Sequence, residues 1–93
     1  SEVAAMNAAT AALSRNDLVS AERYLERVKS DDCLPEYNNA MGVLLLMKGE
    51  YELSEKYLRT AAQSGLDAAK ENLEELAKKK ANALEIKGKN KNE

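Results

Sequence analysis

An internal repeat of 33 residues constrains this chain more than any single residue does. The ten residues that begin at Asn16 align without a gap with the ten that begin at Gly49, so that Tyr24 matches Tyr57. Repeats of about 20–50 residues are typical of stacked helical or strand units, each of which buries its apolar face against the next unit. The repeat therefore favours a scaffold or binding protein over an enzyme built around one central core.

Apolar residues recur at three- and four-residue spacing, which predicts amphipathic helices and an all-α fold. We expect five helices, at about residues 3–13, 18–28, 35–48, 51–63 and 67–86. Asn16, Gly49 and Gly65 suit the left-handed turns that end helices, and Pro35 suits a first helical turn. Residues 40–47 are apolar nearly all round, so the third helix should lie in the middle of the stack.

The end of the chain differs in composition from the rest. Residues 87–93 contain no apolar side chain, which predicts a disordered tail after a single domain at 1–86. The net charge is −6 over residues 1–77 and +4 over residues 78–93. This lysine-rich end has no arginine and no interleaved aromatic residues, so a solvated segment is favoured over a lipid-binding one, and we expect no nucleic-acid partner.

The composition leaves little material for catalysis. The chain has no His, which removes imidazole bases and most zinc sites, and its one Cys, Cys33, cannot form an internal disulfide. No nucleophile stands beside a base, and no glycine-rich loop or metal-ligand spacing is present. We therefore expect no enzymatic activity, no catalytic residues, no metal and no cofactor. No apolar run approaches the roughly 20 residues of a membrane-spanning helix, so we expect no transmembrane segment.

The residues of the two units resemble the tetratricopeptide repeat (TPR) family. That family places small residues where paired helices approach and large ones between units. The second unit supplies Gly42, Gly49, Tyr51, Ser54, Leu58 and Ala61, and the first supplies Ala9, Asn16, Leu18, Ala21, Leu25 and Val28. The segment 61–65, followed by Ala69, Asn72 and Leu73, is also similar to the related Sel1-like repeats. Both units lack the Trp that begins many TPR units.

The resemblance implies a right-handed helix–turn–helix superhelix of about five helices. The units would span about 2–29 and 35–64, and a capping helix would span 67–86. It also implies that the first helix of each unit lines a concave groove for a protein or peptide partner. The residues at those positions are Met6, Thr10, Leu13, Ser14, Glu36, Asn39, Val43, Leu46, Met47 and Asn72. The apolar members of this set could equally belong to the core.

Three functional hypotheses remain open. The first is a non-catalytic protein–protein interaction module that binds a peptide or protein surface. The second is a structural or terminal segment of a larger assembly protein, for instance one of a bacterial cell envelope. The third is self-association into a homodimer, because two repeats are fewer than the roughly three that a stable stack needs. Ser1 is not an initiator Met, so we expect a processed chain or an excised segment, and both cytoplasmic and periplasmic locations stay open.

Overall fold

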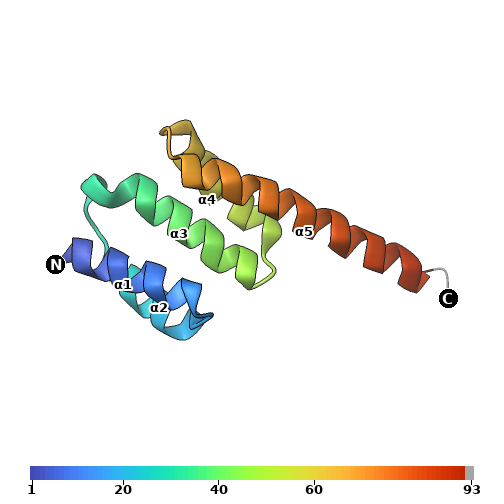
Figure 1. Cartoon of the computed structure of the whole chain (residues 1–93), viewed down its shortest axis with the longest axis horizontal. Helices are drawn as coiled ribbons and strands as arrows, with labels where there is room; N and C mark the ends of the chain where they lie inside the picture. The colour runs from blue at the N-terminus through green and yellow to red at the C-terminus, as the bar shows by residue number, and fades with distance from the viewer. Residues whose placement is uncertain (92–93) are drawn as a thin grey trace.

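The computed structural model describes residues 1–91, which form five α-helices and one short 3₁₀ helix (Figure 1). The elements are α1 (Glu2–Ser14), α2 (Leu18–Leu25), η1 (Asp31–Cys33), α3 (Leu34–Met47), α4 (Tyr51–Gln63) and α5 (Asp67–Lys91). The described residues contain no strand, so the all-α prediction is confirmed. Helix α3 contacts α1, α2, α4 and α5, which agrees with the central place expected for the most apolar helix.

Three turns of one kind reverse the chain after α1, α3 and α4. Asn16, Gly49 and Gly65 have φ angles of 61°, 81° and 93°, in the left-handed region predicted for them. In each turn the next residue's N–H donates to the carbonyl five positions earlier, at 2.8, 2.9 and 3.3 Å respectively. This is the Schellman arrangement, which satisfies carbonyls at a helix end. It folds each helix back on the previous one and so produces the stack.

Small residues bring paired helices close together. The Ser54 hydroxyl donates to the carbonyl oxygen of Gly42 across α3 and α4, at 2.6 Å and buried. A Cβ on Gly42 would lie only 2.5 Å from Cγ of Leu58, so no larger residue fits without movement. Ala9 and Ala21 hold the corresponding positions in α1 and α2, and both are wholly buried. The close approach predicted at these positions is present.

Helix α2 ends three residues earlier than the sequence pattern suggests. After Leu25 the backbone tightens into bonds that span three residues instead of four. The backbone N–H groups of Lys29 and Ser30 then donate to a carboxylate oxygen of Glu2, at 2.8 and 2.7 Å. These bonds, first from Ser30 and then from Lys29, lower the pKa of Glu2 below its ordinary value of 4.5. The Glu2 carboxylate at the start of α1 therefore fixes the backbone of residues 29–30, which connect α2 to η1 and α3.

Helix α5 is longer than expected. It continues to Lys91, so residues 87–91, predicted as a disordered tail, are helical, while Asn92 and Glu93 lie outside the described residues. The segment 67–91 contains no Pro and one Gly and is rich in Ala, Lys and Glu, which are strong helix formers. These strong helix formers therefore keep the exposed residues 81–90 helical, although that part of α5 has no core to pack against.

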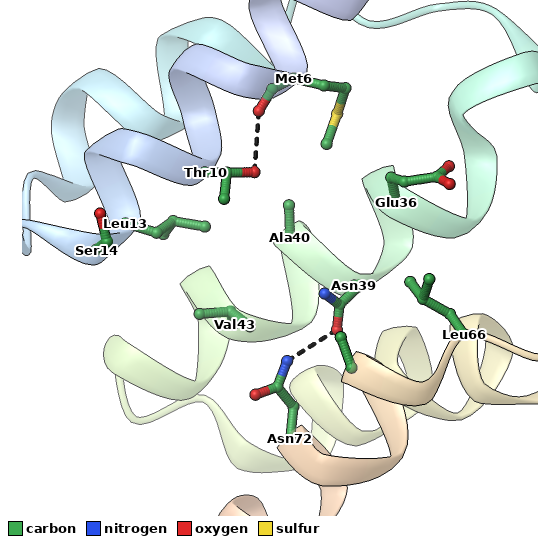
Figure 2. A pocket seen from close by; sticks show the side chains of 11 residues that line it. Met6, Thr10, Leu13, Ser14, Glu36, Asn39, Ala40, Val43, Leu66 and Asn72 are labelled. Carbon is green, nitrogen blue, oxygen red and sulfur yellow. Dashed lines mark hydrogen bonds between the residues drawn. The ribbon is translucent and has the colours of Figure 1, made fainter.

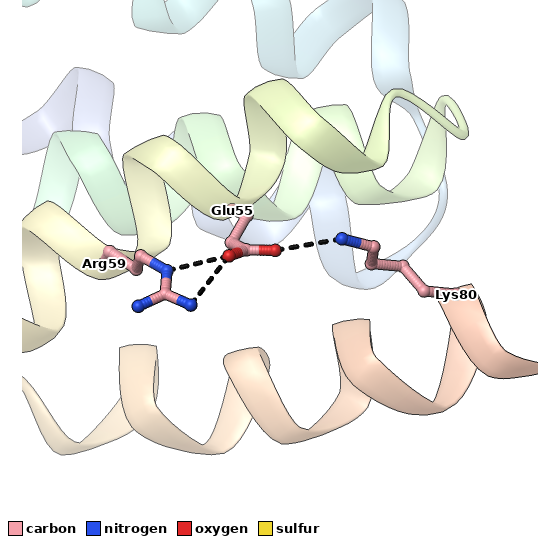
Figure 3. A network of polar contacts seen from close by, with 3 residues as sticks. All are labelled: Glu55, Arg59 and Lys80. Carbon is pink, nitrogen blue, oxygen red and sulfur yellow. Dashed lines mark hydrogen bonds and ion pairs between the residues drawn. The ribbon is translucent and has the colours of Figure 1, made fainter.

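An ion-pair network joins α4 to the middle of α5 (Figure 3). The Glu55 carboxylate accepts from Arg59 Nε at 2.8 Å and from Lys80 Nζ at 3.0 Å. These contacts, with Lys80 first, hold the pKa of Glu55 below its ordinary value of 4.5. Every residue from 81 to 90 is exposed. The second half of α5 therefore extends from the body, as Figure 1 shows.

Candidate functional site

A pocket opens where α1, α3 and the start of α5 face one another (Figure 2). It encloses about 450 Å³. Eight of the ten residues predicted for a partner groove line it, namely Met6, Thr10, Leu13, Ser14, Glu36, Asn39, Val43 and Asn72. The structure thus brings together side chains that lie up to 66 positions apart in the sequence.

The walls of this groove are mainly apolar. Met6 and Leu13 come from α1 and Val43 from α3, and their side chains converge from the two helices (Figure 2). Thr10 lies between the two α1 residues, and its hydroxyl donates to the Met6 carbonyl at 3.0 Å. Because that hydroxyl is already bonded within the helix, α1 presents a largely apolar surface to the groove. Such a wall suits the burial of an apolar side chain of a ligand.

The base of the groove carries a paired amide. Asn72 Nδ2 of α5 donates to Asn39 Oδ1 of α3 at 2.9 Å, in a half-buried setting (Figure 2). An Asn side chain has two N–H donors and a carbonyl acceptor. This bond leaves Asn39 Nδ2 as a donor and Asn72 Oδ1 as an acceptor, both beside the groove. An extended peptide backbone offers the complementary pair, one C=O and one N–H.

The groove has an acidic edge. Among the described residues that line it, Glu36 is the one with a charged side chain, and it is exposed. Residues 1–77, which form the body around the groove, carry a net charge of −6. A cationic group on a ligand would therefore be attracted to this edge. An anionic group would be repelled from it.

Two residues predicted for the groove lie elsewhere. Leu46 is buried in a separate cluster with Leu58 and Leu76, on the side of α3 that faces α4 and α5. It shares a helix face with Asn39 and Val43 but lies nearer the end of α3, where Leu58 and Leu76 cover it. Met47 lies in the last turn of α3, is 36% exposed and does not line the pocket. Leu46 is therefore a core residue, and Met6 and Leu13, which line the groove, are buried members of the main core cluster as well.

Sequence reasoning did not assign Leu66 and Ala68 to the groove, although both line it. Leu66 precedes α5 directly, in the turn that follows Gly65. An apolar side chain in such a turn is stabilised when it is buried against the neighbouring helices. Leu66 is the apolar residue of the turn at residues 64–66. This position in the sequence could have indicated that its side chain lines the groove.

The described part of the chain offers neither a metal site nor a membrane-spanning helix. Among the side chains that the structure describes, no group of three or more Cys, Asp or Glu is placed to hold a metal ion. None of the helices in residues 1–91 combines the length and apolar character needed to cross a membrane. Cys33 is half-buried and packs against the core formed by α1, α2 and α3. The groove is thus the strongest candidate site in this part of the chain.

Comparisons with known proteins identified no relative of this chain. No family model matches the chain, and neither a curated protein nor a solved structure matches it. What the groove binds has therefore to be inferred from the chemistry of its own side chains.

Proposed function

We propose that this chain is a non-catalytic protein–protein interaction module that binds an extended peptide segment of another protein in the groove between α1, α3 and α5. One observation carries the proposal. Met6, Asn39 and Asn72 are spaced at 33-residue intervals, come from three different helices and line one pocket of about 450 Å³. The resemblance of the two units to the TPR family, whose first helices line a partner groove, supports it.

The side chains define the class of ligand. The wall formed by Met6, Leu13 and Val43 would accept one apolar side chain, and burying it would supply about 1.5–3 kcal/mol. Asn39 and Asn72 would bond the backbone beside it, which orients an extended segment without reading its sequence. Glu36 would face a Lys or Arg of the ligand. The groove therefore fits a short, extended segment in which a large apolar residue lies close to a basic one.

A peptide-display library panned against the purified chain tests this proposal. The selected sequences should combine a large apolar residue with a nearby Lys or Arg. The strongest peptide is then synthesised, and its dissociation constant is measured by isothermal titration calorimetry. A library that yields no binding peptide, or peptides that are predominantly acidic, would contradict the proposal.

Matched threonine variants locate the binding face. Thr10 in the groove and Thr60 on α4 are both exposed, and each hydroxyl donates to the carbonyl four residues earlier at 3.0 Å. Thr10→Arg places a long cationic side chain at the groove and should weaken peptide binding by about tenfold or more, since tenfold corresponds to about 1.4 kcal/mol. Thr60→Arg makes the same chemical change outside the groove and should leave the affinity within about twofold. Equal effects of the two variants would place the peptide elsewhere.

A further inference from the structure

Helix α5 packs against α4, but residues 1–91 contain no following helix with which it could form a further pair. α1 packs with α2 and α3 packs with α4, each as a neighbouring pair joined by a tight turn. Helix α5 packs against α4 and α3, and within residues 67–90 its last half-buried residue is Lys80. From residue 81 to 90 it is exposed along its whole length, and Figure 1 shows this half projecting away from the other helices.

An apolar stripe runs along α5 into the projecting half. Leu73, Ala77, Ala81 and Leu84 are spaced by four, four and three residues, so they share one helix face. All four line a groove of about 480 Å³ between α4 and α5, whose other wall includes Glu55. This α4–α5 groove lies on a different face of α5 from Asn72, which points into the peptide groove. Leu84 is 69% exposed at the open end of the stripe.

The charges of α5 are separated along its length. Residues 67–77 contain four acidic side chains and one Lys, for a net charge of −3. Residues 78–90 contain five Lys and one Glu, for a net charge of +4. Two copies of this helix packed antiparallel would place each acidic half beside a basic half, whereas parallel packing would place like charges together. Lys80, near the middle, is already paired with Glu55 at 3.0 Å.

We infer that two copies of this chain associate through α5, packed antiparallel about a two-fold axis, with the projecting end of each α5 seated in the α4–α5 groove of the other copy. A two-fold interface requires a surface complementary to itself. With the axis near Ala81, Leu84 of one copy meets the small Ala77 of the other. Leu73 likewise meets Gly88 at the far end. Large residues therefore face small ones, and each α5 gains the antiparallel neighbour that α1 and α3 already have.

Leu84→Glu and Ile86→Glu test this interface as a matched pair. Both residues are large, apolar and exposed, at 69% and 60%, and both variants add one negative charge. Two residues turn a helix by about 200°, so Ile86 lies on the opposite face from the stripe. The wild-type chain should sediment as two chains at tens of micromolar. Leu84→Glu should raise the dimer dissociation constant by about tenfold or more, and Ile86→Glu should change it by about twofold or less.

Two results of the sedimentation experiment would overturn the inference. The first is a wild-type chain that keeps the mass of one chain up to about millimolar concentration, where only very weak association would escape detection. The second is an equal effect of Leu84→Glu and Ile86→Glu. Circular dichroism spectra of both variants establish that the helices remain folded, which is expected because both positions are exposed.

A cysteine experiment tests the antiparallel direction. In a Cys33→Ser background, Leu73→Cys and Gly88→Cys chains are mixed and oxidised. The antiparallel arrangement brings these positions together across the axis, so mixed disulfide dimers should exceed dimers of either variant alone. A predominance of disulfides between two Gly88→Cys chains would indicate parallel packing and would contradict the inference.

Discussion

Replacing Gly42 by Ala is the sharpest test of how closely α3 and α4 pack. The added Cβ would lie 2.5 Å from Cγ of Leu58 and 3.3 Å from its backbone nitrogen. Leu58 is wholly buried and packs against Leu46 and Leu76. Its side chain therefore has no empty space to move into, and the backbone contact can relax only if the helices separate. Separation would also stretch the buried bond from Ser54 to the Gly42 carbonyl.

Two effects of Gly42→Ala lower the free energy of unfolding, and a third raises it. Overpacking a filled core costs about 1–3 kcal/mol. Weakening one hydrogen bond costs about 0.5–1.5 kcal/mol. Ala is better than Gly inside a helix by roughly 0.5–1 kcal/mol, which offsets part of the loss. We expect Gly42→Ala to lower the free energy of unfolding by about 2 kcal/mol, within a summed range of about 0.5–4 kcal/mol. Each kcal/mol corresponds to about 4–8 °C in melting temperature.

Gly88→Ala is the matched control, because Gly88 is also helical but has no atom within 4 Å of an added Cβ. It should leave the stability unchanged or raise it by up to about 1 kcal/mol. Urea unfolding followed by circular dichroism measures both variants, and an unchanged slope shows that the midpoint shift reflects stability. A Gly42→Ala chain as stable as wild type, with the same helix content, would refute the close packing of α3 and α4.

Two further outcomes can be checked on the same chain. Hydrogen bonds hold the pKa values of Glu2 and Glu55 below 4.5 in the folded state, so the stability they add is present above that value and is lost as the pH falls through the lowered pKa. The melting temperature should therefore fall below about pH 4.5, and Glu2→Gln, unlike Glu52→Gln, should flatten that fall. Leu58→Ala should cost about 2–5 kcal/mol in urea unfolding, whereas Leu53→Ala, 45% exposed on the same helix, should cost less than about 1 kcal/mol.

Local signals in the sequence were sufficient for most of the helices. The boundaries predicted for α4, residues 51–63, are those observed. The turns at Asn16 and Gly49 could be predicted because Asn and Gly adopt the left-handed conformation readily. Such a residue after an apolar helical run usually ends the helix. The resemblance to the TPR family, and not periodicity, assigned Met6, Asn39 and Asn72 to one groove, and all three line the same pocket. Periodicity located the helices because it reports which face of each helix is buried.

Features that depend on distant contacts could not be predicted in the same way. The early end of α2 follows from the bonds between Glu2 and the backbone of Lys29 and Ser30, 27 and 28 residues away. No periodic pattern records such a contact. Leu46 was assigned to the groove by its place on the first helix of a unit, yet the cluster with Leu58 and Leu76 buries it. Its environment depends on where α5 packs, which the spacing along α3 alone does not specify.

Helix α5 contributes residues to both the peptide groove and the α4–α5 groove. Asn72 lies 33 residues after Asn39, so α5 begins where the spacing would place the first helix of a third unit. Its Asn72 face completes the peptide groove by bonding Asn39 at 2.9 Å. The face carrying Leu73 and Leu84 would pack, in a complete unit, against a second helix that residues 1–91 do not contain. One helix therefore closes one groove and leaves another open, so we expect Thr10→Arg and Leu84→Glu to disrupt the proposed peptide binding and the proposed self-association independently.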